Sequence, residues 1–160
     1  MRALTIRQPH AGLIVAGVKN VENRTWATRY RGPIAICASK AMSAEDVRFE
    51  RQWCRENGIP FPEPLLRGGI IGVVDLVGII RPATTPETAV VVCDGLLYTT
   101  VLPSDRLPDS MDWYVDGLFG WVLSSPRPTK FVPYPGRLGL FEVPDHLIRI
   151  LAVGVSTETP

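Results

Sequence analysis

The chain has 160 residues, of which 46% are hydrophobic and 21% are charged, and its formal net charge is +1. This composition excludes a disordered chain, and the length fits one domain. The 15 prolines and 14 glycines argue against long uninterrupted helices and favour strands joined by turns. We therefore expect a single domain over residues 1–153, followed by a frayed tail at 154–160.

The charges are distributed unevenly along the chain. Residues 1–40 contain seven basic side chains and one acid, Glu22, which gives this segment a charge of +6. The other 120 residues contain ten basic and fifteen acidic side chains, a charge of −5. A basic segment of this kind indicates an anionic partner such as nucleic acid, although a solvated basic face would carry the same charges.

The start of the chain predicts a strand, a short helix and an extended segment. Apolar and polar residues alternate over residues 3–7, as in a half-buried strand. Proline is favoured at the start of a helix and glycine after its end, so Pro9 and Gly17 predict a short helix between them. Residues 19–26 are polar with a period of two, which predicts an extended segment.

A buried strand and a capped helix are expected next. Residues 34–38 are apolar without interruption, which is typical of a strand buried on two faces. Ser43 is a good N-cap residue, and Asp46 stands where an acidic side chain stabilises the first turn. The helix is expected to end near Asn57, since Gly58 follows it.

The second half of the chain predicts further strands around an insertion. Residues 69–80 are expected to form a long strand in which Gly72 and Gly78 favour bulges or sharp curvature. Residues 81–117 are rich in aspartate and are expected to be an elaborated insertion. Five to seven short strands and two or three short helices predict an α+β, mainly β fold, a small barrel with the helices packed on it. The remaining predicted elements are short strands at 89–92, 96–101, 118–124, 130–132 and 138–143 and a short helix from Pro144.

Nine segments follow one another in a characteristic order along the chain: residues 4–9, 14–17, Lys19, 22–26, 31–33, 38–40, 69–74, 119–124 and 136–141. In this order and spacing they resemble an ASCH domain, the activating-signal-cointegrator homology domain. The resemblance implies a PUA-like β-barrel with a cleft, between the first helix and the barrel, that is expected to bind RNA or nucleotides. Some more distant members hydrolyse N4-acetylcytidine, and others are reported to bind or cleave nucleic acid.

Lys19, Glu22 and Arg24 are the richest candidate site. In an extended segment Glu22 and Arg24 share a face, since side chains repeat every two residues. A carboxylate fixed by its own arginine can accept a hydrogen bond from a base edge, and Lys19 can hold a phosphate or act as a base. A solvated turn with surface ion pairs would contain the same residues.

The hydrolase members of the family differ from this chain at one position. There a lysine is followed, three residues later, by a threonine nucleophile and then by an arginine. Lys19 and Arg24 match this pattern, but Glu22 stands where the nucleophile would be. A carboxylate cannot replace an activated hydroxyl, although it could orient or activate a water. The sequence therefore leaves open whether the protein is an enzyme that uses Lys19, Glu22 and Arg24.

Further residues are candidates for binding a nucleic acid or nucleotide. Trp26 could stack on a base, whereas Trp121 alternates with apolar residues and is expected in the core. Basic and hydroxyl side chains near strand ends could hold phosphate, although ordinary surface polarity would also place them there. These binding candidates, besides Lys19, Glu22 and Arg24, are Trp26, Arg31, Ser39, Lys40 and Ser124.

Other classes of function are excluded by missing patterns. The sequence has no GxGxxG or phosphate-binding loop and no cysteine/histidine metal pattern, so we expect no cofactor and no metal. Its three cysteines predict buried thiols in a reducing compartment, and no segment is long and apolar enough to cross a membrane. We expect a cytoplasmic protein that binds RNA, short single-stranded nucleic acid or a nucleotide. The acidic insertion, residues 94–116, could instead engage a protein partner or cover the basic cleft.

Overall fold

The structure is a computed structural model that describes residues 1–82, 90–93 and 113–150, with the backbone alone for 90–93. The predicted strand at 96–101, most of the predicted insertion at 81–117 and the predicted tail at 154–160 lie outside the described residues. No helix within the described residues is long and apolar enough to span a membrane.

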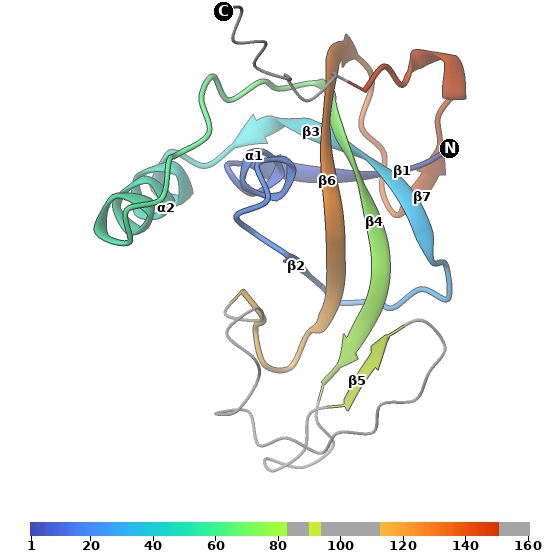
Figure 1. The fold of residues 1–160 in the computed structure, drawn as a ribbon, viewed down its shortest axis with the longest axis horizontal. Helices are drawn as coiled ribbons and strands as arrows, with labels where there is room; N and C mark the ends of the chain where they lie inside the picture. The colour runs from blue at the N-terminus through green and yellow to red at the C-terminus, as the bar shows by residue number, and fades with distance from the viewer. Residues whose placement is uncertain (83–89, 94–112, 151–160) are drawn as a thin grey trace, which may run out of the picture.

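The described elements form one mainly antiparallel sheet with two α-helices and a short 3₁₀ helix (Figure 1). The strand order is β2-β6-β4-β3-β1-β7, and β5 pairs with β4 outside this path. The expected α+β, mainly β class is confirmed. The expected barrel is not, because the sheet of the described strands is open, with β2 at one end and β7 at the other. The elements are β1 (Arg2–Gln8), α1 (His10–Val15), β2 (Val21–Arg24), β3 (Gly32–Met42), α2 (Ala44–Glu56), β4 (Gly69–Arg81), β5 (Val90–Cys93), β6 (Phe119–Pro133), β7 (Leu140–Glu142) and the 3₁₀ helix η3 (Asp145–Leu147).

Two hydrophobic clusters explain why the central strands are apolar on both faces. Successive side chains of a strand point to opposite faces of the sheet. In β3, Ile34 and Ile36 belong to the larger cluster, which includes α1, whereas Ala35 and Cys37 belong to the smaller one. The uninterrupted apolar run at residues 34–38 is therefore a strand that is buried on both sides, as the sequence predicts.

Helix α1 lies directly against the sheet because β4 has a glycine beneath it. A Cβ atom at Gly72 would lie 2.6 Å from a methyl group of Val15, closer than real side chains approach. The pairing of β4 with β6 also shifts register between Ile70 and Gly72 and between Leu76 and Gly78. The predicted irregularities at the two glycines of this strand are thus confirmed.

The sequence expectation for β6 is wrong in one respect. We expected two short strands, at 118–124 and 130–132, separated by prolines, but the chain forms one continuous strand over Phe119–Pro133. The physical reason is that β4 pairs with β6 along nearly its whole length, from Gly120 to Pro133, with Pro128 opposite Gly72 at a shift of register. On its other side β6 pairs with β2 only over Phe119–Val122, so the half that contains the prolines has no β2 ladder to satisfy. Proline is tolerated where no neighbouring strand needs its missing N–H group.

Helix α2 forms where its cap predicts and lies to one side of the sheet (Figure 1). The Ser43 hydroxyl accepts a hydrogen bond of 3.1 Å from the Asp46 N–H group, as in an ordinary N-cap. Asn57 caps the other end, and Gly58 follows with a φ angle of +67°. The start of α2 is thereby fixed close to the end of β3.

Candidate functional site

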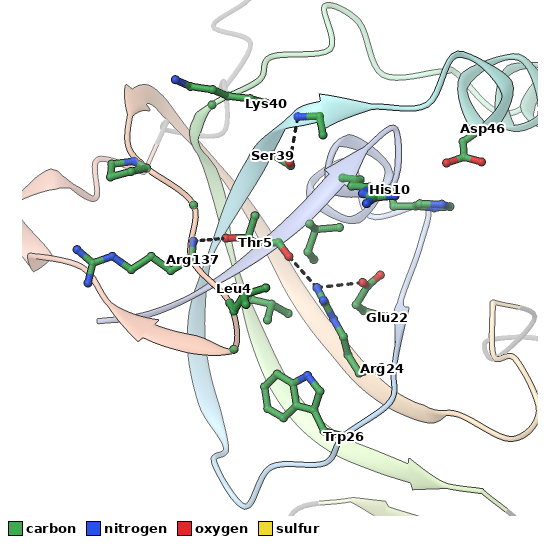
Figure 2. A pocket seen from close by; sticks show the side chains of 18 residues that line it. Leu4, Thr5, His10, Glu22, Arg24, Trp26, Ser39, Lys40, Asp46 and Arg137 are labelled. Atoms are coloured by element: carbon green, nitrogen blue, oxygen red, sulfur yellow. Dashed lines mark hydrogen bonds and ion pairs between the residues drawn. The ribbon is translucent and has the colours of Figure 1, made fainter.

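A cleft of about 980 Å³ opens where β1, β2 and the end of β3 meet the loop between β6 and β7 (Figure 2). The first residue of α1 and the first turn of α2 also contribute side chains. The lining mixes buried aliphatic side chains with charged and hydroxyl groups. The lining residues are Leu4, Thr5, Ile6, Arg7, His10, Glu22, Arg24, Trp26, Ser39, Lys40, Ala41, Asp46, Gly68, Pro135, Gly136, Arg137, Leu138 and Gly139.

Arg24 is fixed in the cleft by two acceptors on different strands (Figure 2). Its Nη2 atom donates a hydrogen bond of 2.8 Å to the carbonyl oxygen of Thr5 on β1. The same atom lies 3.2 Å from Glu22 Oε1, so the predicted sharing of one strand face by Glu22 and Arg24 is confirmed. Holding one nitrogen from two sides restricts the planar guanidinium group to a single orientation.

Lys19 lies behind this ion pair and does not line the cleft. Its side chain is 3% exposed, and its Nζ atom donates a hydrogen bond of 2.6 Å to the carbonyl oxygen of Val21. Nζ also lies 3.9 Å from Glu22 Oε2 and 5.0 Å from the centre of the Trp113 ring. Lys19 therefore reaches the cleft lining through its contact with Glu22, and its ammonium group lies over the ring of Trp113.

Burial shifts the pKa values of these two ionisable groups in opposite directions. It raises the pKa of Glu22 above 4.5, and the nearby Arg24 and Lys19 only partly offset that shift. It lowers the pKa of Lys19 below 10.5, with an opposing contribution from Glu22 and Glu50. In both groups burial opposes the charged form, and the opposite charge of the neighbour favours it.

Trp26 is the aromatic residue of the cleft lining, and it packs against Trp121 in the core. Their ring centres are 4.7 Å apart at an angle of 82°, an edge-to-face contact, and Trp121 Nε1 donates to the Trp26 carbonyl oxygen at 3.1 Å. Trp121 is fully buried, as predicted for a core residue. Trp26 is only partly buried and lines the cleft, so part of its surface stays open to a ligand.

Three exposed cations surround the cleft opening: Arg7, Lys40 and Arg137. Among the described residues, none of the three has a carboxylate within ion-pair distance. Lys40 lies along the backbone at Gly68, where a Cβ atom would be 3.0 Å from the Lys40 Cγ atom. An anion that enters the cleft thus finds positive charge that is not already neutralised.

His10 lines the cleft, although no acidic or metal-ligating residue stands near it in the sequence to mark it as a site residue. Its Nδ1 atom is buried without a hydrogen bond in the described part of the chain, and it lies 3.9 Å from Glu50 Oε1. Burial lowers the pKa of His10 below 6.5, and the positive charge of Lys19 lowers it further. Sequence reasoning missed His10 because Glu50 lies 40 positions away along the chain and reaches it only through the docking of α2.

Of the eight predicted binding residues, the structure brings five into the cleft: Glu22, Arg24, Trp26, Ser39 and Lys40. It places the other three elsewhere, Lys19 behind the cleft and Arg31 and Ser124 outside its lining. The guanidinium group of Arg31 instead donates to backbone carbonyl oxygens of Thr28 and Tyr30. Ser124 lies on β6 opposite Asp75 of β4.

The cleft also contains residues that the sequence did not single out, namely Thr5, Arg7 and Arg137. Thr5 Oγ1 accepts a hydrogen bond of 3.0 Å from the Arg137 N–H group, which ties the loop at 135–139 to β1. The segment at 136–141, part of the family resemblance, could have pointed to Arg137, but it gave no reason to place this loop beside the N-terminal strand. No group of His, Cys, Asp and Glu residues in the described ranges is arranged to hold a metal ion.

The fold and this site define a mainly β domain with a cation-lined cleft between β1, β2 and the end of β3. The sequence profile of the ASCH domain matches residues 4–114, and the chain belongs to the ASCH domain family. Activating signal cointegrator 1 from Homo sapiens and its counterpart from Mus musculus are both 36% identical to it over 78 residues. Each alignment covers 46% of this chain but only 13% of the relative, so the chain corresponds to a small part of those proteins.

Proposed function

We propose that the protein binds RNA, as a short single-stranded segment or a nucleotide, in the cleft. The observation that carries this proposal is the positive charge of Arg7, Lys40 and Arg137, which no carboxylate of the described residues pairs, in a cleft whose lining includes Trp26. Cations without carboxylate partners suit phosphate groups, and a partly exposed tryptophan suits the face of a base. Membership of the ASCH domain family supports the same class of ligand.

The shape of the site favours a short ligand over a duplex. A double helix is bound through cations spread along an extended surface, because its phosphates repeat every few ångströms. Here the cations surround one cleft of about 980 Å³, and the polar groups inside it come from residues that are partly or fully buried. A flexible single strand can place one base in such a cleft and its phosphates on the rim.

The test is a salt titration of binding with matched charge variants. We expect the affinity for a labelled single-stranded RNA to fall steeply with salt, by a slope of roughly 0.7 per phosphate contact. Lys40→Ala with Arg137→Ala is expected to reduce that slope by about 1.4. The control is Arg48→Ala with Arg55→Ala, which removes two exposed cations from α2 outside the cleft lining. Equal slopes for the two double variants, or binding that ignores salt, would overturn the proposal.

A second candidate function is hydrolysis of a modified nucleoside, such as an N4-acetylcytidine-type amide, or of single-stranded RNA. It is favoured by Glu22, a cleft carboxylate whose pKa is raised by burial. Such a group could accept a proton from a water that attacks the substrate, with Arg24 beside the developing negative charge. Incubation with N4-acetylcytidine and with single-stranded RNA, beside Glu22→Gln and Lys19→Ala, tests it. Absence of turnover, or turnover that neither substitution changes, would contradict it.

A protein partner for the acidic segment at 94–116, or a role of that segment in covering the cleft, is an alternative to this function, and a cytoplasmic location stays a prediction. The larger part of that segment lies outside the described residues, and its deletion gives a direct test. If the segment covers the cleft, its removal is expected to tighten RNA binding. Unchanged affinity would count against a covering role.

A further inference from the structure

Leu138 is the most exposed large hydrophobic side chain among the described residues, at 99% of its possible surface. It lies in the loop between β6 and β7 and contributes to the lining of the cleft. Other large hydrophobic side chains are exposed, including Phe49 on α2, but Leu138 alone among those described borders the cleft. A leucine exposed to water contributes little to folding, and a single exposed apolar side chain is ordinary on a protein surface. What distinguishes Leu138 is its place in the cleft lining, next to the exposed Arg137.

The loop that presents Leu138 is held by contacts on both sides. Before it, the Arg137 N–H group donates to Thr5 Oγ1, and Gly136 packs so closely that a Cβ atom there would lie 2.8 Å from the Thr5 methyl group. After it, Leu140 pairs with Leu4 in the β1–β7 ladder. The exposed position of Leu138 therefore comes from the backbone path and not from a loosely attached loop.

Charge and apolar surface stand next to each other on this loop. Arg137 offers an exposed guanidinium group and Leu138 an exposed aliphatic group, and both line the same cleft as Trp26. A nucleotide has the matching pair of features, a charged phosphate and a flat base whose faces are apolar. An apolar group beside a base removes water from the base face without recognising its hydrogen-bonding edge.

We infer that Leu138 contacts the face of a nucleobase in the cleft and favours ligands that carry a base over sugar phosphates of equal charge. This inference rests on the function proposed above, which it deepens by naming what part of the ligand the loop recognises. Arg137 binds the phosphate, and Leu138 covers the base. Because a base face looks alike in all four nucleotides, the contact raises affinity without selecting a sequence.

The experiment compares two labelled probes of equal length and charge, a hexauridylate and an abasic ribose-phosphate oligomer. Leu138→Ala is expected to weaken binding of the hexauridylate about tenfold, or about 1.4 kcal/mol, and to leave the abasic oligomer unaffected. Arg137→Ala is expected to weaken binding of both probes. The control Phe49→Ala removes an exposed apolar side chain from α2 and is expected to change neither.

Each outcome bears on one of the two proposals. If wild-type protein binds hexauridylate and Leu138→Ala binds it equally well, the role of Leu138 is overturned while the proposed function stands. If Leu138→Ala weakens both probes alike, the residue acts through the loop and the inference is again overturned. If the wild-type protein binds neither probe, the proposed function itself fails. Leu138→Met, which keeps an apolar side chain, is expected to retain most of the affinity.

Discussion

Glu22 and Arg24 form an ion pair of 3.2 Å on one face of β2, and the same arginine nitrogen reaches the backbone of β1. The pair thus links two strands that share no ladder among the described residues. Glu22 therefore lies between two cations, Lys19 and Arg24. The charge of this carboxylate matters for stability as well as for any ligand.

Glu22→Gln is expected to lower the free energy of unfolding by about 1–3 kcal/mol, because two partly or fully buried cations lose their counter-charge. Urea unfolding followed by circular dichroism measures the change. The matched control is Glu63→Gln, which disrupts a surface ion pair with Arg51 and should alter stability by less than about 0.5 kcal/mol. Equal effects of the two substitutions would contradict the buried charge arrangement described here.

The stability of the protein should depend on pH through His10. Burial lowers the pKa of His10 in the folded protein below 6.5, the ordinary value expected for the unfolded chain. Below that value the unfolded chain binds a proton that the folded one does not, so stability falls as pH decreases from 6.5 through the lowered folded pKa.

His10→Gln removes this contribution, so its stability relative to wild type should rise as pH falls from about 7.5 to about 5. Unfolding in urea at these two pH values measures the difference. His146→Gln is the control, since His146 is exposed on η3. A His10→Gln variant that tracks wild type at both pH values would show that the histidine is protonated equally in both states.

Gly68 and Gly58 allow a test of how Lys40 is positioned. Both glycines have positive φ angles, +74° and +67°, so alanine at either position should cost about 1 kcal/mol of stability. Only at Gly68 would the new Cβ atom meet a side chain, 3.0 Å from Lys40 Cγ, whereas the space at Gly58 is open.

We therefore expect both alanine variants to be destabilised similarly in urea unfolding. Gly68→Ala alone should also weaken RNA binding, by about as much as Lys40→Ala does, because it displaces the lysine side chain. Unchanged RNA affinity in Gly68→Ala, together with a clear effect of Lys40→Ala, would mean that the stem of Lys40 moves without cost.

Trp26→Leu should reduce the affinity for single-stranded RNA by about 1–3 kcal/mol, the usual contribution of one stacked base. Leucine keeps an apolar contact with Trp121, so the fold is expected to persist. Trp53→Leu is the matched control, because Trp53 makes a comparable edge-to-face contact with Trp113 and lies outside the cleft lining. Calorimetric titration at low salt distinguishes the two variants, and equal losses would argue against stacking on Trp26.

Local patterns were enough to predict several parts of the fold and site. The cap at Ser43, the doubly buried strand at 34–38 and the shared face of Glu22 and Arg24 all follow from interactions within a few residues. Helix caps and the two-residue period of a strand depend on local backbone geometry, which is the same whichever elements pack against the helix or strand. Family membership was predictable for a related reason, since its motifs lie in fixed order along the chain.

The composition of the cleft depended on contacts between distant parts of the chain. Arg137 reaches Thr5 across 132 positions because β7 pairs with β1, and no local pattern specifies which strands become neighbours. The same holds for Lys19, whose burial under Trp113 converts an expected phosphate ligand into a partner of Glu22. The continuity of β6 likewise depends on its pairing with the distant β4, which extends from Gly120 to Pro133.

The sequence by itself determined that a basic N-terminal segment carries a family motif, and that Glu22 and Arg24 act together within it. Only the tertiary structure decided which cations line one cleft without a carboxylate partner in the described part of the chain, and that Leu138 stands exposed beside them. The physical reason is that strand pairing and helix docking are set by the free energy of burying the whole sheet, to which each local segment contributes only a small part.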